Sequence, residues 1–130
     1  LRAAALPFAT LPLAALAALL LAPFLISQAV AHHGWSWTTG GNIELTGIIR
    51  EAQLGNPHGV LTVDVEGEMW TVEVGQPWRN QRAGLTDDHF APGTEITVDG
   101  EPAADGAERR VKAERITIAG ELFELYPGRS

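Results

Sequence analysis

Beyond residue 42, apolar and polar positions alternate along most of the chain with the period of two residues that is typical of half-buried β-strands. The pattern predicts strands at residues 43–54, 60–65, 69–74, 95–98 and 109–118, and a short final strand at 122–126. In the first strand Leu45, Gly47 and Ile49 share one parity, and the glycine indicates either a bulge or a tight coil of the sheet.

One segment breaks this period. Trp78, Arg82 and Leu85 recur at helical spacing just after Pro77, a residue common at helix starts, and Thr86 is a candidate cap for a further turn. The expected order is therefore strand, strand, strand, helix, strand, strand. That order predicts a mainly β fold, a five- to six-stranded OB-like Greek-key barrel with one short helix between strands 3 and 4. A plain two-sheet sandwich is the alternative.

The large apolar side chains near the third strand are expected to supply the core. Trp70, Val72 and Val74 share one parity and should face Val63 of the preceding strand. Trp78, at the start of the helix, is most simply a core residue as well.

An uncharged run rich in Ala and Leu precedes the barrel at residues 3–26 and is long enough to span a bilayer. Three prolines interrupt it, Arg2 precedes it, and Ala29-Val30-Ala31 has the small-x-small form that signal peptidase cleaves. We therefore expect a signal peptide at 1–31, an extended N-terminal arm at 32–42 and the barrel at 43–130. Such a protein is periplasmic or secreted and meets the membrane only transiently, during export. A retained anchor is the alternative.

Composition narrows the classes of function. The chain carries 16 acidic and 9 basic residues, and removal of Arg2 leaves 16 against 8, a formal charge of −8. This balance argues against a nucleic-acid partner, which usually needs a basic surface. Cysteine is absent, so disulfides and thiolate metal sites are excluded. With no activated nucleophile, Gly-rich phosphate loop or paired-acid signature, the sequence predicts a binding protein and not an enzyme.

The histidines offer the clearest chemistry. Cleavage at the expected position gives His32 a free α-amine beside its imidazole, and these two nitrogens form a chelate suited to Cu(II). A third nitrogen would come from His33 or from His58, which lies in the Gly-Asn-Pro-His-Gly turn after the first strand. Adjacent histidines on an extended chain point to opposite sides, so Gly34 would have to supply a kink. We predict a copper site of His32, His33 and His58; the alternative is a solvated terminus and a turn histidine that caps backbone groups.

Two tryptophans follow the terminal histidines. Trp35 and Trp37 flank a single residue, so their rings share a parity and are expected to pin the arm onto the barrel. The alternative for either ring is that it stacks on a ligand. The alternative to copper binding is a structural role, in which the protein docks on another exported protein through the Trp arm and a barrel edge.

Asn56 and Arg82 complete the candidate ligand-binding residues. Asn56 belongs to the same turn as His58, and the alternative for it is a role in the turn alone. Arg82 lies three residues after Arg79 near one helix face, an arrangement that could clamp a carboxylate. In so acidic a domain, pairing of these arginines with Glu73 or with the acids at 87–88 is the simpler expectation.

Several short motifs together resemble a known family. They are the His-His-Gly-Trp segment at 32–35, Asn-Pro-His at 56–58, Trp-Thr-Val-Glu at 70–73 and Asn-Gln-Arg-Ala-Gly-Leu-Thr at 80–86. The chain is similar across essentially its whole mature length to the DUF6152 family of small exported bacterial proteins, for which no activity is established. The resemblance implies an exported β-barrel domain whose recurring motifs include His32, His33, Asn56, Pro57, His58, Arg82 and Gly84.

The exported protein should begin at His32, because the small-x-small site follows an uncharged run with no basic stop-transfer cluster. N-terminal sequencing of protein recovered from the periplasm or medium measures this directly. A retained leader, or a start beyond Gly34, would contradict both the cleavage site and the copper site built on it.

Overall fold

The computed structural model describes residues 3–5 and 33–129, and the chain divides into two compact units, Leu1–Ser36 and Trp37–Ser130. Apart from residues 3–5, the predicted leader lies outside the described residues. In the first unit, η1 (His33–Trp35) is a single turn of 3-10 helix. The arm expected to be extended therefore begins with a turn, with Gly34 at its centre. No helix within 3–5 or 33–129 is long and apolar enough to cross a membrane.

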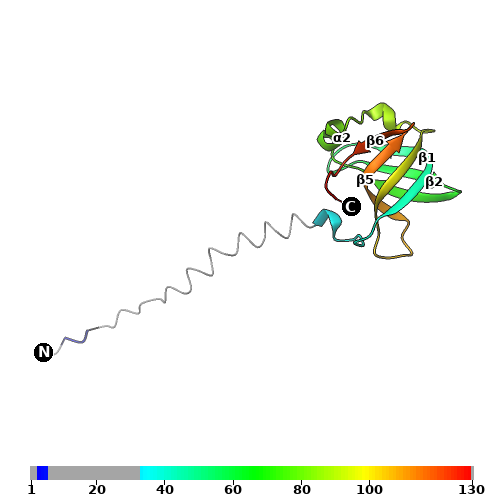
Figure 1. Cartoon of the computed structure of the whole chain (residues 1–130). Helices are drawn as coiled ribbons and strands as arrows, with labels where there is room; N and C mark the ends of the chain where they lie inside the picture. Colours follow the sequence, from blue (N-terminus) through cyan, green and yellow to red (C-terminus); the bar gives the residue numbers. More distant parts are fainter. Residues whose placement is uncertain (1–2, 6–32, 130) are drawn as a thin grey trace. The chain divides into compact units, whose positions relative to one another are not determined.

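The second unit is a closed barrel (Figure 1). Its elements are β1 (Ile43–Gln53), β2 (Val60–Val65), β3 (Glu68–Glu73), α2 (Pro77–Ala83), η2 (Asp87–Phe90), β4 (Glu95–Pro102), β5 (Arg110–Ile118) and β6 (Glu121–Glu124). The strand order is β3-β2-β1-β4-β5-β6, and a further pairing of β3 with β5 closes the first five strands. With α2 between β3 and β4, this is the expected OB-like order, and the closure rules out an open two-sheet sandwich.

β5 is the strand on which closure depends. Along one edge it is antiparallel to β4. Along the other edge its first residues run parallel to β3, where Val72 pairs with Val111, and its last residues run antiparallel to β6, where Ile116 pairs with Phe123. One strand thus contacts three neighbours, and its central residues are enclosed on both edges.

The barrel interior is filled by the aliphatic side chains that the alternation predicted. Val63, Val72 and Val74 are each at most 2% exposed. Trp70 is only partly buried, at the margin of this core. The assignment of Trp78 to the core is wrong, because its side chain is 50% exposed. It precedes the buried Asn80 by two residues, about 200° of helical rotation, and so lies on the opposite face of α2.

Gly47 permits a close approach of two strands and does not mark a bulge. The register of β1 against β2 shifts between Ile49 and Glu51, further along the strand. A Cβ atom at Gly47 would lie 2.4 Å from the backbone oxygen of Asp64 on β2. Any side chain there would therefore force the two strands apart, which explains the glycine within an otherwise regular strand.

Leu61→Ala should lower the free energy of unfolding by about 2–5 kcal/mol, because it leaves a cavity at a fully buried site. The control Leu122→Ala truncates a leucine that is 55% exposed and should cost less than about 0.5 kcal/mol. Urea denaturation of both variants measures the difference. Equal losses would mean that Leu61 does not face the barrel interior.

Candidate functional site

Charged side chains are buried on the outer face of the barrel. Glu73 on β3, Lys112 on β5 and Glu101 on β4 lie directly opposite one another in the strand register. They alternate with core residues such as Val72 and Val111, so they point away from the interior. All three are nevertheless at most 7% exposed, since the arm and the segment after β6 cover this face. Burial of a carboxylate costs several kcal/mol unless partners compensate.

Glu73 is fully paired. Its Oε1 lies 2.5 Å from His58 Nε2, and its Oε2 accepts a hydrogen bond from Arg110 Nε at 2.6 Å. The Arg110 guanidinium in turn stacks on the Trp37 ring, 3.7 Å from its centroid. We call His58, Glu73, Arg110 and Trp37 the Glu73 cluster. It joins the turn after β1, the end of β3, the start of β5 and the N-terminal arm.

The Glu73 cluster fixes the orientation of the His58 ring. An ionised carboxylate can only accept hydrogen bonds, so the neutral ring carries its proton on Nε2 and a lone pair on Nδ1. The His58 side chain is 29% exposed, which leaves part of the ring open to a ligand. A histidine held from behind by a carboxylate is the usual arrangement of a metal-binding imidazole, because the carboxylate orients the ring and raises its basicity.

The arm is fastened to the barrel from Trp37 onward. Ala104 N donates to Trp37 O at 2.9 Å, and Thr39 N donates to Pro102 O at 2.9 Å. A β-bridge joins Thr38 to Ala103 between these bonds. The anchoring role expected for Trp37 agrees with these contacts, and Arg110 occupies one face of its ring. Trp35 belongs to the other unit.

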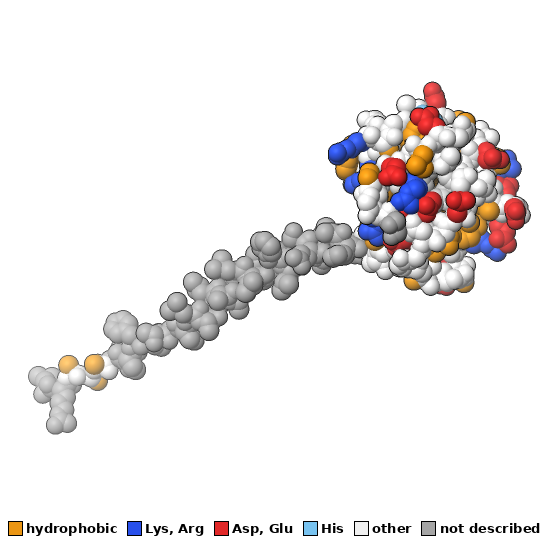
Figure 2. All heavy atoms as spheres, viewed as in Figure 1, with side chains coloured by type: hydrophobic (Ala, Val, Ile, Leu, Met, Phe, Trp, Pro, Cys, Tyr) orange, Lys and Arg blue, Asp and Glu red, His pale blue; other side chains and the backbone are white. Residues whose placement is uncertain are grey.

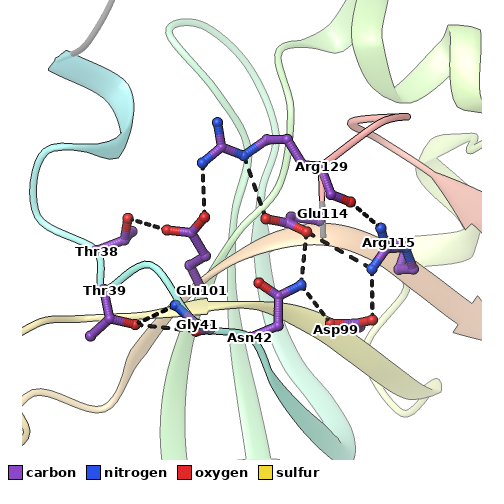
Figure 3. A network of polar contacts seen from close by, with 9 residues as sticks. All are labelled: Thr38, Thr39, Gly41, Asn42, Asp99, Glu101, Glu114, Arg115 and Arg129. Atoms are coloured by element: carbon purple, nitrogen blue, oxygen red, sulfur yellow. Dashed lines mark hydrogen bonds and ion pairs between the residues drawn. The ribbon is translucent and has the colours of Figure 1, made fainter.

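A second polar network, which we call the tail network, covers the same face of the barrel further along β5 (Figure 3). Arg129, after β6, binds Glu101 with Nη2 at 2.8 Å and Glu114 with Nε at 3.4 Å. Asn42 Nδ2 donates to Glu114 Oε2 at 2.8 Å. Its remaining contacts involve Thr38, Thr39, Gly41, Asp99 and Arg115. The tail network therefore ties both flanking segments to the buried carboxylates of β4 and β5.

These contacts shift several pKa values. Burial raises the pKa of the Glu101 carboxyl, but hydrogen bonds from Thr38 and Arg129 outweigh it, and the pKa lies below its ordinary value. Burial lowers the pKa of Lys112 despite the opposing effect of Glu73. Burial likewise raises the pKa of Tyr126, whose ring lies 6.0 Å from Lys112 Nζ.

Of the predicted copper ligands, only His58 has a described side chain. His32 and the side chain of His33 lie outside the described residues, so that part of the site stays a prediction. Among residues 3–5 and 33–129, no group of three or more His, Asp or Glu side chains could hold a metal ion. His58 shares a shallow hollow of about 290 Å³ with Asn56, which is exposed in the same turn.

Arg82 is not brought to this turn. It is exposed and lines a separate hollow beside β6, together with Arg79. Pairing of the two arginines with Glu73 is wrong, because that carboxylate is occupied by His58 and Arg110. Pairing with Asp87 or Asp88 is wrong as well, because neither arginine forms an ion pair within residues 33–129. On the face of the barrel shown in Figure 2, acidic side chains are spread out with basic ones between them.

The comparison with known families gives one clear result. Residues 21–112 match the model of DUF6152, described as a family of unknown function. The chain belongs to this family. DUF6152 supplies no activity, and the curated proteins contain no match to the chain.

Among solved structures, the chain is similar to the S. pombe Stn1-Ten1 complex at 20% identity and a TM-score of 0.49, over 62% of this chain and 59% of that one. It is also similar to TiaS in a complex with tRNA, AMPCPP and agmatine, at 16% identity and a TM-score of 0.46, over 59% of this chain and 18% of that one. The DUF6152 chain thus spans less than two thirds of each matched chain. Sequence identities and TM-scores this low say nothing about ligands. The OB-like fold is assigned from the strand order of this chain alone.

Tyr126, the one tyrosine of the chain, should ionise above pH 10 in the folded protein and near pH 10 in denaturant. Because the folded state holds the phenol proton more tightly, its contribution to stability is complete below the unfolded pKa and is lost as the pH rises through the folded pKa. Absorbance at 295 nm across a pH titration measures both midpoints. Coincident midpoints would show that the Tyr126 ring is not buried in the folded protein.

Proposed function

We propose that this DUF6152 chain is a small exported binding protein, without catalytic activity, that holds Cu(II) between the mature N-terminal His32 and His58 of the barrel. The single observation that supports it most is the bond between His58 Nε2 and the buried Glu73 carboxylate, which turns Nδ1 into the free nitrogen of an oriented imidazole. A turn histidine that merely capped backbone groups would need no such buried acid.

The length of the arm supports a shared site. Trp37 is held against Arg110, and Arg110 binds the same carboxylate as His58. His32 precedes Trp37 by five residues, which span at most about 17 Å when extended. A copper site shared by the His32 α-amine and His58 has to form within this reach of Trp37.

The donor set suits copper better than a hard cation. An α-amine, the imidazole of the same residue and a second imidazole supply three nitrogens, which match the tetragonal preference of Cu(II). His33 is a further nitrogen donor in the same segment, and η1 bends the chain at this point. The site needs neutral amine and imidazole groups, so acid should release the metal.

Docking on another exported protein is the rival function. It draws support from β6, which ends the strand order and carries Leu122, 55% exposed. Trp37 supports it less, because its ring already lies on Arg110. Docking requires neither the α-amine nor His58, so one set of titrations separates the two functions.

The mature protein should bind Cu(II) more than tenfold more tightly, by about 1.4 kcal/mol or more, than a form whose α-amine is acetylated. Acetylation removes the amine nitrogen from the chelate with the His32 imidazole. His58→Ala should weaken binding as well. Isothermal titration calorimetry near neutral pH measures all three proteins.

His89→Ala is the matched control, because His89 lies in η2 and its Nδ1 already accepts a hydrogen bond from Thr86 N at 2.9 Å. This variant should bind copper like the parent. Equal affinity of the mature, acetylated and His58→Ala proteins would rule out the proposed site and leave docking as the better account.

A further inference from the structure

The arginines of the described residues divide into two groups. Five of the seven bind a carboxylate, namely Arg50, Arg109, Arg110, Arg115 and Arg129. The other two, Arg79 and Arg82, lie three residues apart on α2 and form no ion pair with any residue in 33–129. In a chain with 16 acidic residues and 9 basic ones, two neighbouring guanidinium groups without an acidic partner need a separate explanation.

Arg79 is held in place without its charge being matched. Its guanidinium lies between the rings of Trp78 and Tyr126, at 4.6 and 4.2 Å from their centroids. Nη1 donates to Leu125 O at 3.1 Å. Its Nε is buried and has no acceptor among the described residues. Aromatic stacking and one backbone bond therefore fix the plane of this cation, while donors on it stay unused.

Both arginines line one hollow of about 370 Å³ between α2 and the segment that follows β6. Figure 1 shows these two elements beside each other at one end of the barrel. The rest of the lining is mostly apolar, from Ala83, Leu125 and Pro127, and Glu124 completes it. The hollow thus combines two cations, an apolar wall and one acid.

We propose that this hollow binds a small organic monocarboxylate. The carboxylate lies against Arg79 and Arg82, whose planar groups match it in shape and donor spacing, and the apolar body packs on Ala83 and Pro127. Attraction by the two arginines and repulsion by Glu124 both grow with the charge of the anion, so charge alone does not choose between a carboxylate and phosphate. The apolar part of the lining makes the choice, because it offers contacts only to an anion attached to an apolar group.

The test uses metal-free protein in EDTA, so that its result does not depend on the copper site. Sodium benzoate, sodium acetate and inorganic phosphate are titrated separately at constant ionic strength, with amide signals of α2 and Leu125 followed by NMR. Benzoate should give saturable shifts confined to these residues. Acetate should bind more weakly because it lacks the apolar body, and phosphate should bind more weakly than benzoate.

Arg82→Gln removes the exposed cation without disturbing the stacked Arg79, and it should weaken benzoate binding at least fivefold. Arg109→Gln is the matched control, since Arg109 is likewise exposed but pairs with Glu68 at 2.8 Å on another part of the barrel. It should bind benzoate within twofold of the parent. Absence of saturable shifts, equal affinity of the Arg82→Gln variant, or tighter binding of phosphate than of benzoate would each overturn the proposal.

Discussion

The burial of carboxylates on the outer face of β3, β4 and β5 is the constraint on which the rest of this structure depends. Closure of the barrel through β3 and β5 aligns Glu73 and Glu101 on either side of Lys112, and Glu114 follows on β5. Each carboxylate, once removed from water, requires hydrogen-bond donors. Some of these donors lie on β5. Others lie outside the barrel strands, on His58, Asn42 and Arg129. This need for hydrogen-bond donors explains why the arm, the turn after β1 and the segment after β6 lie against this face of the barrel.

The same constraint links stability to the candidate site. Glu73 is at once a structural acid, neutralised by Arg110, and the group that orients His58. A metal-binding imidazole needs such a partner, and here the partner is present because the barrel closes where it does. The Trp37–Arg110 contact extends the arrangement to Trp37 of the arm.

Much of the fold could be predicted from local pattern, and much of the polar site could not. The period of two located the strands, and the helical segment after Pro77 gave the OB-like order, because both signals reside in neighbouring residues. Trp78 was misplaced because hydrophobicity alone does not say which face of a short helix meets the core. Glu73 and Glu114 occupy outward positions of alternating strands, where a charged side chain is normally solvated. They are buried only because segments distant in the sequence cover them.

For the arginines of α2, the expectation of Glu73 as a partner was wrong, because His58 and Arg110 already bind that carboxylate. Competition among partners is a tertiary property, which spacing along one helix does not reveal.

The position of Arg129 after the final strand bears on the order of assembly. The carboxylates of β4 and β5 lack this cation until the segment beyond β6 has joined the barrel. A chain emerging from a ribosome or a translocation channel would therefore hold Glu101 without its arginine partner, and would reach its full set of contacts only when that segment arrives.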